Sequence, residues 1–104
     1  MLKIYDVMIQ VLVEMKPVVG NVQRHDPDLA RQLKRAASSV ALNIAEGSGS
    51  SGGTRTQRYR NALGSAREVG ACFDIAHALG YSAIHQGLSD GLRQVQATLL
   101  KVAH

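Results

Sequence analysis

Aromatic side chains are almost absent from this 104-residue chain, which has no tryptophan, one phenylalanine and three tyrosines. A core built from this composition must be aliphatic and closely packed. The single cysteine, Cys72, excludes an internal disulfide framework and is typical of a protein in a reducing compartment. No segment shows the alternating apolar and polar pattern of a strand, so nothing in the sequence predicts a sheet.

Long apolar runs are also missing. No uncharged apolar run approaches the roughly 18 residues that a membrane span needs. The amino terminus, MLKIYDVMIQVLVEM, contains Asp6 and Glu14 and has no signal-peptide cleavage site. The length suits one domain, residues 1–104, around a single core. We therefore expect a cytoplasmic, single-domain protein with no membrane partner.

Apolar residues recur every three or four positions along most of the chain, which is the spacing of amphipathic helices. The predicted helices are residues 4–22, 26–46, 54–79 and 82 onward. Pro17 should interrupt the first helix near Met15. Asp26 and Ser82 are the expected N-caps of the second and fourth helices, and Gly80 should stop the third. Four helices with short links predict an all-α fold, an antiparallel up-down-up-down four-helix bundle.

The stretch Arg35–Thr54, RAASSVALNIAEGSGSSGGT, divides into a helix of small residues and a glycine-serine segment. From Gly47 to Gly53, four glycines and three serines predict a flexible loop, with Thr54 starting the next helix. The glycines spell G-x-G-x-x-G, but the dinucleotide fingerprint requires a preceding strand. A phosphate-binding P-loop requires a lysine where Gly53 stands. We reject both nucleotide-binding interpretations and expect no cofactor.

Two segments carry a family resemblance: AASSVALNIAEGSG at residues 36–49 and ALGSAREVGACFDIAHALGY at residues 62–81. Both closely resemble the four helix bundle protein family, and the N-I-A-E-G-S-G run is the most specific part. That family includes proteins encoded in intervening sequences of bacterial large-subunit ribosomal RNA genes, and the accessory variability determinant of diversity-generating retroelements. The resemblance, which covers most of the chain, implies a small antiparallel helical bundle that assembles as a ring, commonly a pentamer. It implies no enzyme activity, and nucleic-acid binding only in some members.

Asn43 and Glu46 are polar residues in the small-residue, apolar part of the second predicted helix. Glu46 could act as a general base or a metal ligand, but no partner nucleophile accompanies it. We interpret both residues as structural. Asn43 is expected to satisfy backbone groups across a packed seam. Glu46 lies at a helix carboxyl end, where the dipole disfavours its charge, so we expect a fixed cationic partner.

A metal site has little support in the sequence. The candidate ligands are Glu68, Asp74, His77 and His85. A di-metal bundle needs Glu-x-x-His twice and two further glutamates, whereas the chain offers one imperfect copy. Cys72 is expected to be a buried small hydrophobe, and no nucleophile-elbow sequence supports a Ser-His-Asp site. We expect no metal and no catalytic residues.

The net charge of +4 is unevenly distributed, because residues 24–67 carry +5 and the remainder carries −1. The basic residues around the glycine-serine segment are the candidate contacts to nucleic acid: Arg31, Lys34 and Arg35 on the second predicted helix, and Arg55 and Arg58 on the third. Backbone donors at the start of the third helix would also favour an anion. The alternative is a solvated face or a set of intersubunit salt bridges.

The first predicted helix has a wider apolar face than one core contact needs, so we expect a closed homo-oligomer. The number five comes only from the family resemblance. Two functions remain open. One is an oligomeric accessory protein that binds RNA or DNA phosphates without reading sequence, alone or beside a nucleic-acid-processing protein. The other is a scaffold that binds only proteins. The basic cluster favours the first, while the absence of aromatic residues among the arginines argues against base stacking.

Overall fold

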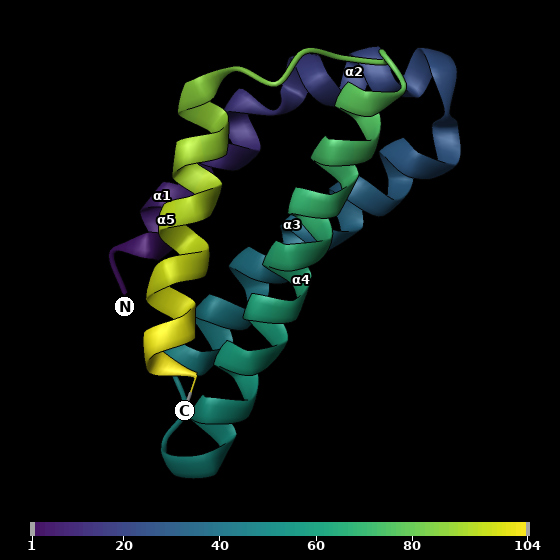
Figure 1. Cartoon of the computed structure of the whole chain (residues 1–104). Coiled ribbons are helices and arrows are strands. Elements are labelled where there is room, and N and C mark those ends of the chain that lie inside the picture. The colour runs from purple at the N-terminus through teal and green to yellow at the C-terminus, as the bar shows by residue number, and fades with distance from the viewer. Residues whose placement is uncertain (1, 104) are drawn as a thin grey trace.

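The structure is a computed structural model that describes residues 2–103, and the described chain is helical without any strand (Figure 1). Its five helices are α1 (Ile4–Glu14), α2 (Lys16–His25), α3 (Pro27–Ser48), α4 (Gly52–Ala78) and α5 (Gln86–Val102). The all-α prediction is confirmed. None of these helices combines the length and the apolar composition that crossing a membrane requires.

The break predicted in the first helix is present at Met15, which separates α1 from α2. Pro17 lies in the first turn of α2, where its missing N–H would have no helical partner and its fixed φ suits a helix start. α2 continues to His25, slightly further than predicted. Asp26 then caps α3, as expected, by accepting a hydrogen bond of 3.0 Å from the backbone N–H of Leu29.

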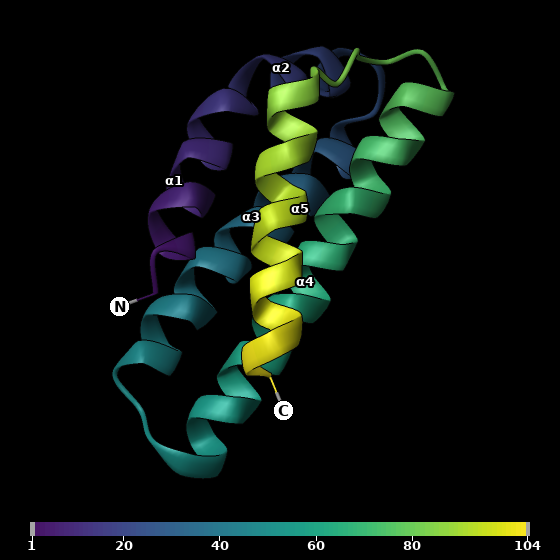
Figure 2. The same ribbon diagram turned by 60° about the vertical axis from the view of Figure 1, so that its left-hand side comes forward.

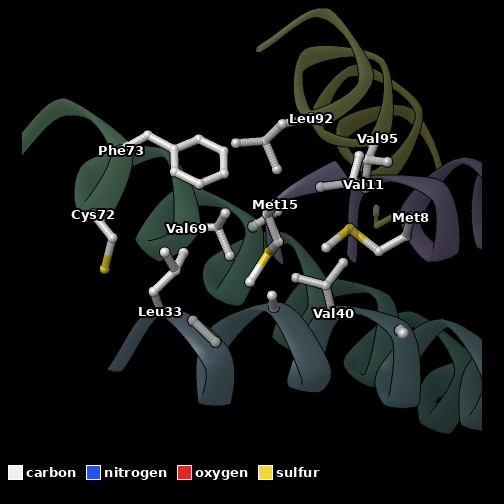
Figure 3. Packing of buried hydrophobic residues seen from close by; sticks show 14 of the residues in the cluster. Met8, Val11, Met15, Leu33, Val40, Val69, Cys72, Phe73, Leu92 and Val95 are labelled. Carbon is white, nitrogen blue, oxygen red and sulfur yellow. The ribbon is translucent and has the colours of Figure 1, made fainter. Parts of the chain in front are cut away.

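α3 and α4 lie side by side and contact each other more extensively than any other pair of helices (Figures 1 and 2). α5 packs against α4 and α1, and both α1 and α2 contact α3. These helices enclose one apolar cluster (Figure 3). Its largest fully buried side chains are Met8, Val11, Val22, Leu33, Val40, Ile44, Val69, Leu88, Val95 and Leu99.

The predicted flexible loop is much shorter than expected. Only Gly49–Ser51 separate the two helices, because α3 continues to Ser48 and α4 begins at Gly52 rather than Thr54. Gly52 has a φ of +59°, a left-handed conformation that glycine adopts without a steric penalty. Glycine is therefore favoured where α4 begins, and the residues on either side of the connection remain helical.

Serine hydroxyls explain why α3 extends through a segment of poor helix formers. Ser48 Oγ donates to the carbonyl oxygen of Ile44 at 3.0 Å, and Ser50 Oγ donates to that of Glu46 at 2.8 Å. The last carbonyls of a helix have no partner within the helix, so added donors stabilise its end. The serines that predicted a loop instead help the helix to continue.

Gly47 lies buried inside α3, and its role is to make room for a side chain of α4. A Cβ at this position would lie 2.7 Å from Cδ1 of Tyr59 and closer still to Cε1. The buried Tyr59 ring occupies the space that any larger residue at 47 would need. The glycine therefore permits close packing of α3 on α4.

α4 ends at the predicted glycine. Gly80 has a φ of +74°, and its N–H donates to the carbonyl oxygen of His77 at 3.1 Å. The N–H of Tyr81 donates to the carbonyl oxygen of Ala76 at 2.8 Å. These two bonds form a Schellman motif, in which a left-handed glycine closes the helix.

The prediction that Ser82 caps the last helix is wrong. α5 begins at Gln86, and its N-cap is His85, whose Nδ1 accepts a hydrogen bond of 3.1 Å from the backbone N–H of Leu88. Ser82 is buried and accepts a hydrogen bond of 3.1 Å from Asn21 Nδ2. Its hydroxyl is committed to α2, so the chain between α4 and α5 is held against α2 before α5 starts.

We predict that Gly47→Ala destabilises the protein and that Gly64→Ala does not. The new methyl group at 47 would displace the Tyr59 ring from a packed site, at a cost of about 1–3 kcal/mol. Gly64 is exposed inside α4 with nothing within 4 Å of a Cβ, so alanine there should add about 0.5–1 kcal/mol of helix stability. Urea unfolding of both variants measures the difference. Equal effects would show that Gly47 has no packing role.

Candidate functional site

Three of the five predicted nucleic-acid contacts meet in one hollow of about 450 Å³ on the surface shared by α3 and α4. We call this hollow the basic groove. It is lined by Lys34, Arg35, Ser38, Ser39, Leu42, Asn43, Glu46 and Arg58. Arg31 and Arg55 are not among its lining residues. The antiparallel packing of α3 on α4 therefore brings Arg58 beside Lys34 and Arg35, which are more than 20 positions away in the sequence.

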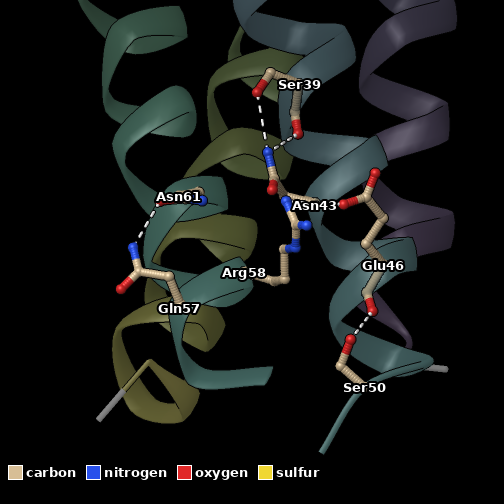
Figure 4. Close-up of polar contacts among 7 residues, drawn as sticks. All are labelled: Ser39, Asn43, Glu46, Ser50, Gln57, Arg58 and Asn61. Atoms are coloured by element: carbon tan, nitrogen blue, oxygen red, sulfur yellow. Dashed lines mark hydrogen bonds and ion pairs between the residues drawn. The ribbon is translucent and has the colours of Figure 1, made fainter. Parts of the chain in front are cut away.

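Glu46 has a cationic partner, but this partner is exposed rather than fixed as the sequence predicted. Its Oε2 lies 3.0 Å from Nη1 of Arg58 on the facing helix (Figure 4). Both side chains are exposed, and pairs of this kind contribute less than about 1 kcal/mol to stability. The pair partly neutralises the positive charge at the end of the basic groove that lies near the α3–α4 connection. Because the pair is weak, Arg58 can exchange the Glu46 carboxylate for another anion at low cost.

Asn43 does not bridge helices as predicted. Its Nδ2 donates to the carbonyl oxygen of Ser39 at 3.0 Å and to Ser39 Oγ at 3.1 Å, both one turn earlier in α3 (Figure 4). The link across the seam comes from Ser65 of α4, whose Oγ donates to Ser39 Oγ at 2.9 Å. An asparagine in a helix can reach the previous turn more easily than the next helix. The hydrogen bonds of Asn43 are therefore local to α3.

Arg55 acts as a cap for the end of α3. Its Nε donates to the carbonyl oxygen of Ser50 at 2.9 Å and to that of Gly47 at 3.3 Å. Cations near a helix carboxyl end also interact favourably with the helix dipole. Arg31, on the exposed side of α3, forms an ion pair with Asp28 three residues earlier.

Lys34 and Arg35 are the cations of the groove without a carboxylate partner. Both are exposed, and across residues 2–103 neither forms an ion pair or a side-chain hydrogen bond. Arg35 also lines an adjoining hollow of about 560 Å³ together with Ser65 and Glu68. The uncompensated positive charge of this surface is therefore concentrated on the middle of α3.

The candidate metal ligands do not form a cluster. In the described part of the chain, no three His, Cys, Asp or Glu residues are grouped so that they could hold a metal ion. His85 accepts the cap hydrogen bond of α5, as described above. His77 is exposed near the end of α4, and its carbonyl oxygen accepts one bond of the Schellman motif.

Cys72 is buried in α4, as the sequence predicted, and only 3% of its surface is exposed. Burial raises the pKa of the Cys72 thiol above its ordinary value of 9.0, and the nearby carboxylate of Glu68 raises it further. Both effects disfavour the thiolate, which is the reactive form of cysteine. This environment suits a packing residue rather than a nucleophile.

We predict that Cys72 makes stability fall at alkaline pH. Well below pH 9 the thiol is neutral in both states, whereas at higher pH the unfolded chain ionises first and the free energy of unfolding decreases as pH rises. Urea unfolding at pH 8 and pH 10, at one protein concentration, should show a larger loss for the native chain than for Cys72→Ala. Parallel losses in the two proteins would rule out this contribution.

A family model described as 23S rRNA-intervening sequence protein matches residues 1–101. No curated protein and no solved structure matches the chain. The family match spans nearly the whole length and includes both segments that carry the resemblance described above. The chain therefore belongs to the 23S rRNA-intervening sequence protein family.

Proposed function

We propose that this protein is a non-enzymatic accessory protein that assembles as a closed homo-oligomer and binds nucleic acid through its phosphates. The observation that carries the proposal is the pair of exposed cations in the basic groove, Lys34 and Arg35, which have no carboxylate partner among the described residues. Membership of a family named for a 23S rRNA intervening sequence supports it.

The assembly that we infer follows the resemblance in the sequence. α1 and α2 together count as one helix of the bundle, so the five helices form an antiparallel up-down-up-down four-helix bundle in one domain. The apolar residues that α1 leaves exposed, Ile9 and Val13, support further association. If five copies form a ring, the net charge of +4 per chain becomes about +20, and each basic groove is repeated around it.

Within each subunit the proposed phosphate contacts are unequal. Lys34 and Arg35 are the principal proposed contacts, because neither must leave a partner to reach a phosphate. Arg58 would contact phosphate by exchanging the Glu46 carboxylate, and Arg31 by exchanging Asp28. Arg55 is held against the end of α3 and adds charge near the site rather than a mobile contact.

Binding of this kind would not depend on base sequence. Among residues 2–103, no aromatic side chain lines the basic groove, so bases find no surface there on which to stack. Reading base edges requires side chains presented by an element that enters a nucleic-acid groove. The cations of the groove are instead spread over two packed helices, which suits contact with a backbone.

A scaffold that binds only proteins is the second candidate. The observation that favours it is Leu42, which is 61% exposed and lines the basic groove among its cations. An exposed leucine contributes little to phosphate binding but is common in protein interfaces. Protein binding would depend on the Leu42 side chain, whereas phosphate binding would not, so the two functions can be separated by experiment.

We predict that Lys34→Glu with Arg35→Glu weakens binding to mixed-sequence RNA and DNA equally. Each lost phosphate contact should reduce the slope of log affinity against log salt by about 0.7–0.9. Fluorescence anisotropy at low and physiological salt measures both quantities, and the native protein is expected to bind with a dissociation constant of roughly 1–100 μM at physiological salt.

The matched control is Lys3→Glu with Arg24→Glu, which changes the net charge equally outside the groove. It should retain most of the affinity. Equal losses in the two double variants would indicate general attraction rather than a site. No binding by the native protein at low salt would favour the protein-only scaffold. In that case Leu42→Ala should reduce binding to a partner protein.

We also predict that Glu46→Gln tightens RNA binding. Removal of this carboxylate frees Arg58 and eliminates a negative charge from the groove. The gain should be about two- to fivefold, the equivalent of one exposed ion pair. Anisotropy at low salt would detect it. A decrease in affinity would mean that Glu46 holds Arg58 in its binding position.

A further inference from the structure

A second hollow, of about 300 Å³, lies where the break between α1 and α2 faces α3. We call it the junction hollow, and its lining residues are Leu12, Met15, Lys16, Val19, Lys34 and Ser38. Because α3 presents a lysine and a serine here instead of large apolar side chains, a recess remains beside the core.

The floor of the junction hollow is apolar. Met15 belongs to the buried core, with 3% of its surface exposed. Leu12 and Val19 are partly buried and pack against that core. These three side chains line a hollow that already exists, so a ligand could cover them without a rearrangement of the helices. Removing their apolar surface from water would favour its binding.

The rim of the junction hollow carries positive charge. Lys16 of α2 and Lys34 of α3 are exposed, and within residues 2–103 neither forms an ion pair. Ser38 adds an exposed hydroxyl to the same lining. In the described chain no carboxylate lines this hollow. The hollow therefore combines an apolar surface with two cations that are free to bind an anion.

The carboxylates of the neighbouring helices do not cancel this charge. Glu14 follows Val7 by two turns of α1, so it lies on the side of α1 where Val7 approaches Gly91 of α5. Asp6 lies ten residues before Lys16, about 15 Å along the helix axis. The two carboxylates of α3 are each paired with an arginine: Asp28 with Arg31, and Glu46 with Arg58.

The geometry points to a binding site for a small apolar anion, namely a short alkyl chain that ends in a carboxylate. The chain would lie on the apolar floor, and the carboxylate would lie between Lys16 and Lys34. A nucleic-acid phosphate could use the two lysines but would leave the floor uncovered. A free acid is favoured over a lipid in a membrane, because the hollow is at the small end of known ligand pockets and holds one short chain.

The bound acid would also act on the proposed phosphate contacts, because Lys34 and Ser38 line both the junction hollow and the basic groove. A carboxylate held by Lys34 would occupy one of the two groove cations that have no partner. Bound acid would therefore weaken RNA binding, and by linkage bound RNA would weaken acid binding by the same factor. This regulatory part rests on the proposed function, whereas the binding site itself does not.

Ligand-observed NMR with sodium octanoate tests the site whatever the oligomeric state of the protein. The expected dissociation constant is roughly 0.1–10 mM, as the efficiency of small ligands allows. Lengthening the acid from hexanoate to decanoate should tighten binding roughly two- to fourfold per methylene until the chain extends beyond the hollow. Octanol and octyltrimethylammonium match the chain length without the negative charge and should bind more weakly. Equal binding of all three would overturn the inference.

Two variants and a matched control locate the site. Lys16→Gln removes one rim cation and should weaken octanoate binding about two- to fivefold. Ser38→Phe places a ring over the hollow from an exposed position and should abolish saturable binding. Lys101→Gln is the control, because Lys101 is exposed on α5 outside the hollow. Circular dichroism checks that all three fold. Equal losses in the two lysine variants, or no loss in Ser38→Phe, would overturn the inference.

RNA anisotropy with and without octanoate, at matched ionic strength, tests the regulatory part. Saturating octanoate should reduce the RNA affinity of the native protein about as much as Lys34→Gln does, and should have little effect on Lys34→Gln itself. An RNA affinity that bound octanoate leaves unchanged would overturn this part.

The same measurements separate the inference from the proposed function. Octanoate binding by a protein that binds no RNA at low salt would support the site and overturn the nucleic-acid role. RNA binding without octanoate binding would overturn the site alone, as expected if another subunit covers the hollow. Binding to phosphatidylglycerol vesicles but not to octanoate would also overturn it, because the lysines would then serve a membrane surface.

Discussion

The close approach of α3 to α4 is the constraint on which the other features of this protein depend. The two helices contact each other more extensively than any other pair in the described chain, and both bury small residues: Ala36, Ala37 and Ala41 of α3, and Ala62 and Ala66 of α4. Gly47 extends this contact to the carboxyl end of α3, where the Tyr59 ring fills the space beside the glycine. A chain with few aromatic residues obtains its core density from backbones that lie near each other.

That approach also sets the alignment of the polar residues along the edge of the seam. It places Arg58 opposite Glu46, and Ser65 opposite Ser39. It also brings Arg55 within reach of the carbonyl groups that end α3. The groove that carries Lys34 and Arg35 is therefore a product of core packing. A change in the core at Gly47 would shift both sides of the groove relative to each other, although residue 47 is buried.

Much of this fold could be predicted from local sequence signals. The break at Met15 before Pro17, the Asp26 cap and the end of α4 at Gly80 each depend on a few neighbouring residues, and each was predicted correctly. The failures have two causes. Ser82 looks like a cap, but its hydroxyl accepts a hydrogen bond from Asn21, 61 residues earlier. The glycine-serine segment looks like a loop, but Ser48 and Ser50 donate to carbonyl oxygens four residues earlier, and Arg55 of α4 donates to the carbonyl oxygen of Gly47.

The candidate site shows the same division. Composition located the excess positive charge, and helical periodicity placed Lys34 and Arg35 on the exposed side of α3. The sequence could not indicate which cations are already engaged, because Arg55 is occupied by backbone carbonyls and Arg58 by a carboxylate of another helix. Charge alone would rank all five residues equally. Once the occupied cations are set aside, the free charge lies on one turn of α3, so a phosphate contact there would depend on two residues rather than on a broad basic surface.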